Sequence, residues 1–192
     1  MQISAINAVV SASYEQKVPD MPTDALSEII AKTKITEVLT RYCRGIDRCD
    51  LECLIAVFWP DAQCDYGSGL QNAIDWSTAT VAALKGMLRT QHAISNILID
   101  LDDRGAKAET YCQAYHEFDS PEGRREMLVG GRYLDRLEAR GGVWRIARRV
   151  YVMDWNRNGP STSEWDTGIY ASLKTRGARL PDDPLSGFLT DG

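Results

Sequence analysis

The second half of the chain contains four long stretches with strand composition, and only short turn sequences separate them. These stretches are residues 91–101, 106–118, 126–139 and 143–155, and the links between them read DDRG, DSPEGRR and RGG. Short links that contain Gly, Pro or Asp are typical of antiparallel neighbours. The pattern therefore predicts a four-stranded antiparallel meander.

The first half is dominated by helical spacing. Apolar residues recur on one face of residues 24–48, and basic residues lie on the opposite face, which predicts a long amphipathic helix. The apolar residues are Ile35, Val38, Leu39, Tyr42 and Ile46, and the basic ones are Arg41, Arg44 and Arg48. A second, short helix is expected from Asp50 (DLECLIAVF), ending at Trp59-Pro60.

Two further segments complete this part, a short strand at 62–67 and a helical segment at 71–88. Helices followed by an antiparallel meander indicate the α+β class. We expect N-terminal helices that close against one strongly curved antiparallel sheet, forming a cone. The hollow end of such a cone would hold a deep apolar pocket.

Three regions follow from these patterns. Residues 1–22 are expected to be an N-terminal tail, and residues 23–155 form the predicted domain. Residues 156–192 contain three prolines and several Gly/Asp turns, which favours a short helix at 162–174 and then an extended tail. We expect this C-terminal extension to close the pocket or to contact a neighbouring subunit.

Composition excludes several classes of partner. The chain has 22 Lys+Arg against 27 Asp+Glu, a net charge of −5, which argues against nucleic acid or an anionic membrane as the main partner. No apolar run approaches the roughly 20 residues needed to cross a bilayer. Five cysteines without a CxxC pair indicate reduced thiols, no metal site and a cytoplasmic location.

Few side chains can move protons near neutral pH, and only His92 and His116 have suitable ordinary pKa values. His92 begins the first long strand, so it is either a packed core residue or a working base. His116 stands beside Glu117 near a strand end, where an exposed position is expected. Asp47 ends the first helix, where it either pairs with a neighbouring cation or orients His92 and stabilises its imidazolium form.

Tyrosines and arginines supply the remaining candidate groups. Tyr42 lies on the core face of the helix and Tyr66 ends the short strand, and either could be simple packing. Arg148 and Arg149 are adjacent in the last strand, so one of them must face inward or sit at a bulge. An inward arginine would suit an anionic group. The sequence lacks the glycine-rich and nucleophile motifs of nucleotide-dependent enzymes and hydrolases, so no cofactor is expected.

Three segments resemble the SnoaL-like branch of the NTF2-like superfamily, which includes hexachlorocyclohexane dehydrochlorinase, bile acid 7α-dehydratase and scytalone dehydratase. They are residues 42–62 (YCRGIDRCDLECLIAVFWPDA), the TQHAISN segment around His92, and residues 130–155. The resemblance implies that Asp47 and His92 form the family's dyad, with His92 as the base. It also implies catalytic roles for Arg149, Tyr42 and Tyr66.

By the same resemblance, the protein is expected to be a cofactor-free lyase acting on a hydrophobic ring compound: a steroid, terpenoid, polyketide or halogenated alicycle. A homodimer or homotrimer is also implied. The residues expected to contact the substrate are Phe58, Tyr115, Tyr151, Met153 and Trp155. An isomerase of the ketosteroid type and a non-catalytic binding module are the alternatives.

Overall fold

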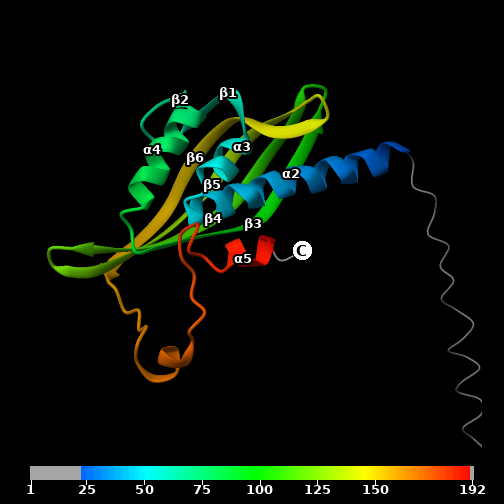
Figure 1. Ribbon diagram of the computed structural model, residues 1–192. Helices are drawn as coiled ribbons and strands as arrows, with labels where there is room; N and C mark the ends of the chain where they lie inside the picture. Colours follow the sequence, from blue (N-terminus) through cyan, green and yellow to red (C-terminus); the bar gives the residue numbers. More distant parts are fainter. Residues whose placement is uncertain (1–22, 191–192) are drawn as a thin grey trace, which may run out of the picture. The chain divides into compact units, whose positions relative to one another are not determined.

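Four long antiparallel strands form most of the sheet, as the turn pattern predicts. In the computed structural model, which describes residues 23–190, they are β3 (Arg89–Asp102), β4 (Gly105–Ser120), β5 (Gly123–Arg140) and β6 (Val143–Pro160). Each begins or ends a few residues beyond the predicted stretch. With two shorter strands they make one six-stranded sheet in the order β2-β1-β6-β5-β4-β3 (Figure 1).

The two shorter strands correct one part of the prediction. β1 spans Phe58–Asp65, so it includes Trp59 and Pro60, which were expected to end a helix. β1 runs parallel to β6 on one side, and on its other side it pairs antiparallel with β2 (Gln71–Asn72). The sheet is therefore mixed and not purely antiparallel. Pro60 is tolerated here because this strand is short and its ladder to β6 is interrupted between Phe58 and Gln63.

The first three helices lie within a few residues of the predicted segments. α2 covers Thr23–Arg48, α3 covers Leu51–Ala56 with Asp50 as its N-cap, and α4 covers Ala73–Leu84 with Asn72 as its N-cap. Cys49 adopts a left-handed φ of 51°, which ends α2 and turns the chain directly into α3. In the C-terminal extension, a 3-10 turn at Gly168–Ser172 replaces the short helix expected at 162–174. The part expected to be an extended tail contains the helix α5 (Leu185–Thr190).

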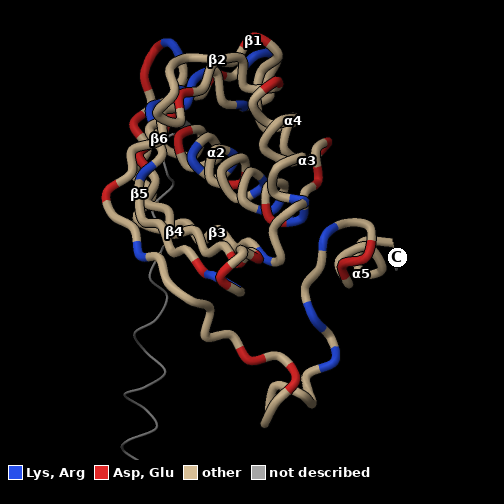
Figure 2. Tube along the Cα trace, turned by 90° about the vertical axis from the view of Figure 1, so that its left-hand side faces the viewer, with Lys and Arg blue, Asp and Glu red and all other residues tan. Residues whose placement is uncertain are grey.

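The chain divides into two compact units, residues 1–31 and 32–192, and the fold described here is that of the second unit. In this unit α3, α4 and the part of α2 from Lys32 onward lie on one side of the sheet (Figure 2). Ile35, Leu39, Tyr42 and Ile46 of α2 are at most 3% exposed and join the core, as their spacing predicts. The predicted tail at 1–22 lies outside the described residues.

A β-bulge in β6 resolves the question posed by its arginines. Leu137 of β5 pairs with Ile146, and the next pair joins Arg136 to Arg148, so Ala147 is an extra residue. The bulge places Ile146 and Arg149, three positions apart, on the same inner face, where both are fully buried. Arg148 is exposed. None of the helices in the described part of the chain is long and apolar enough to cross a membrane.

Candidate functional site

Asp47 and His92 make a two-point contact. The carboxylate oxygen Oδ1 of Asp47 lies 2.7 Å from Nδ1 of His92, and Oδ2 accepts the backbone N–H of His92 at 2.8 Å. Both side chains are 8% exposed. Because an ionised carboxylate only accepts, Nδ1 carries the proton in the neutral ring and Nε2 keeps its lone pair. No residue among 23–190 makes a hydrogen bond to Nε2.

The local fold explains why the two side chains meet. Asp47 is in the last turn of α2, one residue beyond Ile46, which points into the core. His92 lies near the start of β3, and it pairs with Ala114 of β4 on the inner face of the sheet. The end of the helix therefore lies over the start of the strand, at its second inward position, the one after Thr90.

The dyad opens on a cavity of about 210 Å³ between the helices and the sheet, which we call the dyad cavity. Its wall is mainly aromatic and aliphatic, with a few polar groups. The lining residues are Tyr42, Ile46, Tyr66, Trp76, Thr80, Leu84, His92, Cys112, Ala114, His116, Val129, Tyr133 and Tyr151. Four of the predicted site residues, Tyr42, Tyr66, His92 and Tyr151, are thus brought to one cavity.

Tyr42 and Tyr66 form a hydroxyl pair, with their oxygens 2.6 Å apart. The Tyr66 ring stacks on Trp76 at 4.0 Å between centroids. Burial raises the pKa of both tyrosines above the ordinary value, and the nearby charge of Arg149 only partly opposes this. Both groups therefore remain phenols at neutral pH, and the pair holds one hydroxyl proton that a ligand in the cavity can receive as a hydrogen bond.

Arg149 lies behind this pair and does not line the cavity. Nε and Nη2 each donate to the Asp135 carboxylate at 2.7 Å, and both side chains are fully buried. The guanidinium carbon lies 4.0 Å from the centroid of the Tyr42 ring and 4.1 Å from that of Tyr133. Burial opposes the charge, but the Asp135 carboxylate outweighs burial and raises the pKa of Arg149 well above its ordinary value.

His116 corrects an expectation from the sequence, because it is 8% exposed and lines the dyad cavity. Its ring meets that of His92 edge to face, with centroids 5.4 Å apart. Burial lowers the pKa of His116 to about 4, and the positive charge that His92 can carry adds to this effect. His116 is therefore neutral at pH 7. The signal for its position is strand alternation, since Cys112 and Ala114 precede it on the inner face.

Four residues predicted to contact the substrate do not line the dyad cavity. Phe58 is buried in the core, where it meets the edge of Tyr42. Met153 is 59% exposed, and Trp155 is 41% exposed over Gly130. Tyr115 belongs to the opposite face from Ala114, and its hydroxyl lies 3.0 Å from Oγ of Ser163 in the extension. Tyr115 faces away from the cavity because side chains alternate between the two faces of a strand. Trp155 does so because a second bulge, at Asp154, shifts this alternation by one residue.

The sequence analysis also missed three residues around the site. Tyr133 and Trp76 line the dyad cavity, and Asp135 is the counter-ion of Arg149. Tyr133 and Asp135 alternate with exposed residues of β5, and this period of two was a usable signal. The approach of α4 to Tyr66 depends on tertiary packing, so nothing local to Trp76 indicates its role.

Cysteines and metals add little to this site. All five cysteines are free thiols, and burial raises the pKa of Cys43 to about 12 and that of Cys64 to about 11, so both stay protonated. Cys112 lines the cavity and its Sγ lies 3.2 Å from the Tyr133 hydroxyl. Residues 23–190 contain no cluster of three potential metal ligands.

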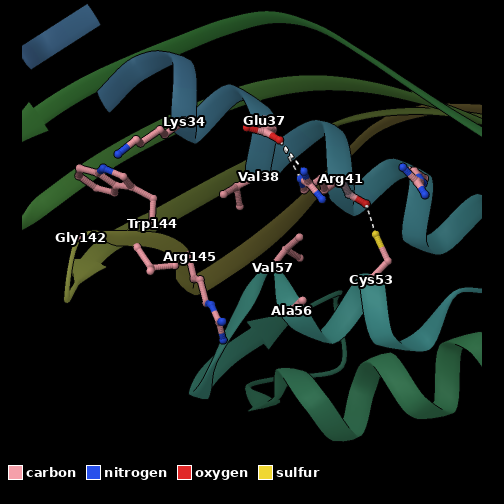
Figure 3. Close-up of a pocket in the computed structure, with 12 residues that line it drawn as sticks. Lys34, Glu37, Val38, Arg41, Cys53, Ala56, Val57, Gly142, Trp144 and Arg145 are labelled. Atoms are coloured by element: carbon pink, nitrogen blue, oxygen red, sulfur yellow. Dashed lines mark hydrogen bonds and ion pairs between the residues drawn. The ribbon is translucent and has the colours of Figure 1, made fainter. Parts of the chain in front are cut away.

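A second depression, of about 520 Å³, lies between α2, α3 and the start of β6 (Figure 3). Its walls carry Lys34, Arg41, Arg44 and Arg145, with Trp144 on the β6 side. Arg41 pairs with Glu37 at 2.6 Å, and a dashed line marks this ion pair in Figure 3. None of the predicted site residues lines this basic groove, so the candidate site is the dyad cavity.

Several solved structures share the fold of this chain. The Kfla4162 protein of Kribbella flavida is 18% identical with a TM-score of 0.63, covering 68% of this chain and 95% of its own. A candidate scytalone dehydratase of Novosphingobium aromaticivorans is 19% identical with a TM-score of 0.62, covering 73% and 98%. The hexachlorocyclohexane dehydrochlorinase LinA-type3 of Novosphingobium barchaimii is 17% identical with a TM-score of 0.62, covering 73% and 97%.

These likenesses establish an NTF2-like fold of the α+β class, in agreement with the sequence prediction. None of the curated protein sequences matches the chain. The model of the SnoaL-like domain matches residues 27–150, which is more than half of the chain and includes every residue that lines the dyad cavity except Tyr151. The chain belongs to the SnoaL-like domain family.

Proposed function

We propose that this protein is a cofactor-free lyase that eliminates water or a hydrogen halide from a hydrophobic ring compound. The observation that carries the proposal is the dyad: Asp47 holds Nδ1 of His92, while Nε2 is left without a partner beside an aromatic cavity. A base oriented in this way contributes about 10²–10⁴-fold to a proton-transfer step.

In the proposed reaction, Nε2 of His92 takes a proton from a ring carbon. The electrons of the broken C–H bond form the new double bond, and the leaving group departs from the adjacent carbon with its own bonding pair. Asp47 stabilises the imidazolium that results. A departing hydroxide takes a proton from the Tyr42–Tyr66 pair and leaves as water, whereas a halide leaves as the anion. The imidazolium proton then returns to the tyrosine pair or to solvent.

Arg149 and His116 assist this step in different ways. The Arg149 charge lies behind the Tyr42 and Tyr133 rings, so it stabilises negative charge that develops on the tyrosine pair. His116 is neutral near pH 7 and lines the dyad cavity, so its ring can hydrogen-bond a polar substituent of the substrate. In the proposed reaction, the proton of the ring carbon therefore goes to His92 and not to His116.

The size of the cavity narrows the list of substrates. Sites for drug-sized ligands usually enclose about 300–1,000 Å³, and the dyad cavity encloses about 210 Å³. A compound with one or two rings fits this space better than a four-ring steroid. Halogenated alicycles and small polyketides are therefore favoured over steroids.

An isomerase remains the competing reaction, and the lining argues against it. Isomerases of the ketosteroid type work with a pair of acids, whereas the residues that line the dyad cavity include no carboxylate. The Asp47 carboxylate is already committed to both donors of His92.

The test is product analysis with two probes, hexachlorocyclohexane and scytalone, monitored by chloride release and by the mass of the product. Loss of HCl or water from either probe supports the proposal. An isomerised product that keeps all its atoms would favour the isomerase. Binding of both probes without any turnover would favour a non-catalytic module.

We also expect a homodimer or homotrimer formed through the outer face of the sheet. Large apolar side chains that alternate with inward-facing ones lie exposed there. Examples are Leu98, Tyr111, Leu134 and Trp155, which are 64%, 43%, 40% and 41% exposed. Light scattering on the wild type and on a Leu98→Lys/Leu134→Lys double variant tests this: the mass should fall to that of a monomer in the variant.

A further inference from the structure

The C-terminal extension returns to the domain at the end of α2, next to the dyad. Figure 1 shows it leaving β6, turning in a loop and coming back to the last turn of that helix. The Leu180 backbone N–H donates to the Arg48 carbonyl at 3.0 Å. In return, Nη1 of Arg48 donates to the Ala178 carbonyl at 2.8 Å and to the Asp183 carboxylate at 3.0 Å. These bonds fasten the returning segment to the helix.

Arg179 reaches from this segment to the back of the dyad. Its Nη1 donates to the backbone carbonyl of Asp47 and, at 2.8 Å, to Oγ1 of the buried Thr90. Its Nη2 donates to the Leu84 carbonyl at 3.3 Å. Thr90 lies two residues before His92 on β3. One guanidinium thus joins the element that carries the acid to the element that carries the base.

The chemistry of the three acceptors favours an arginine. The Asp47 and Leu84 carbonyls lie in the last turns of α2 and α4, where backbone carbonyls lack helical partners and the negative ends of two helix dipoles meet. A planar fork with several donors can serve both carbonyls and a hydroxyl at once, whereas a lysine offers a single compact ammonium.

We propose that Arg179 is a positioning residue for the Asp47–His92 dyad, which makes the C-terminal extension a working part of the site. The role assigned to Arg179 rests on the proposed function, but its geometric effect on the dyad can be measured without any substrate. The family model ends at residue 150, so this contribution comes from chain outside the matched domain.

The main experiment compares Arg179→Gln with Arg176→Gln in the full chain. Arg176 is a matched control, because it lies three residues away and binds only within the extension, at Asp166 and at the Leu173, Trp165 and Tyr170 carbonyls. A misplacement of about 1 Å can cost about 100-fold in rate. Arg179→Gln should therefore lower kcat about 10–100-fold with KM nearly unchanged, and Arg176→Gln should leave kcat within about twofold.

Two proton NMR readouts need no turnover. The Nδ1 proton that His92 shares with Asp47 should give a strongly downfield signal in the wild type and in Arg176→Gln, and that signal should broaden or shift in Arg179→Gln. The titration of His116 should also move upward in Arg179→Gln, because the Arg179 charge is one of the groups that lower the pKa of His116. His92 and Asp47, the other charged groups that act on His116, are not substituted in this variant.

The outcomes separate the two proposals. An unchanged Nδ1 signal and unchanged kcat in Arg179→Gln would overturn the positioning role, whatever the reaction proves to be. A changed signal in a protein that eliminates nothing from either probe would keep the positioning role and reject the lyase. If Arg179→Gln does not fold, Thr90→Val replaces it: the extension stays docked through Arg48, and a smaller change of the same signal is expected, whereas no change would contradict the proposal.

Discussion

Two buried aspartates, Asp47 and Asp135, each bind a basic partner at 2.7 Å. Asp47 binds an imidazole that lines a cavity and can gain or lose a proton. Asp135 binds a guanidinium that is enclosed on all sides and keeps its charge at any ordinary pH. The comparison teaches that similar hydrogen-bond geometry serves chemistry in one pair and a fixed electrostatic field in the other.

The largest effect is expected from removing the base. His92→Gln keeps a polar side chain but cannot act as a base, so kcat for elimination should fall about 10²–10⁴-fold. Thermal unfolding should change little, because Asp47 still accepts the backbone N–H of residue 92. The measurement is kcat on whichever probe is turned over. Near-normal turnover in this variant would contradict the difference drawn here, because the Asp47–His92 pair would then be structural, like Asp135–Arg149.

The second pair should show the reverse pattern, a loss of stability before any loss of chemistry. Asp135→Asn leaves Arg149 as a buried charge without a counter-ion, which costs about 3–5 kcal/mol of unfolding free energy. Asp154→Asn is the control, because it breaks an ion pair of Arg132 that is 30% exposed on the arginine side and 36% on the aspartate side. Such a pair contributes about 0–1 kcal/mol. The measurement is the free energy of unfolding of both variants in urea. Equal losses of unfolding free energy would contradict the assignment of Asp135 as the counter-ion of a buried charge.

The Tyr42–Tyr66 hydroxyl pair is the next target, and removal of one hydroxyl tests its role. Tyr66→Phe keeps the ring stacked on Trp76 and removes one donor. A loss of about 10²-fold in kcat is expected if the pair protonates the leaving group or binds developing charge. Tyr170→Phe, which alters a half-exposed ring of the extension, should have no effect. The loss of kcat in Tyr66→Phe should be smaller with a halide substrate than with an alcohol, because a halide leaves without a proton.

The smallest effect concerns pH. The pKa of His116 is lowered to about 4 in the folded protein, whereas an unfolded histidine titrates near 6.5. The unfolded chain therefore binds more protons between these values, so stability is fully present above pH 6.5 and falls as the pH drops toward 4. Urea unfolding of His116→Asn should show a flatter pH profile, and an identical profile would refute the assignment.

Much of this arrangement could be predicted from the sequence because it depends on local periodicity. The spacing of Ile35, Leu39, Tyr42 and Ile46 fixes which face of α2 is buried, and the short turns fix the order of β3 to β6. The assignment of the dyad depended on a family resemblance. The structure places Asp47 against His92, and the catalytic role of the two residues stays a prediction.

The parts that could not be predicted depend on phase and on contacts between distant segments. A change of strand phase explains Trp155, because the bulge at Asp154 that causes it is not indicated by residue type. Asp135 becomes the counter-ion of Arg149 only through the register between β5 and β6. The docking of Arg179 joins residues more than a hundred positions apart, which no local pattern encodes.

The extra residue at Ala147 has a consequence for comparing relatives of this chain. In a member of the family without that insertion, the arginine facing the inner aspartate stands two positions after the buried aliphatic residue, and here it stands three positions after Ile146. A gapless alignment would pair the exposed Arg148 of this protein with the enclosed arginine of such a relative. Equivalence along this strand must therefore be assigned from ladder partners and not from column number.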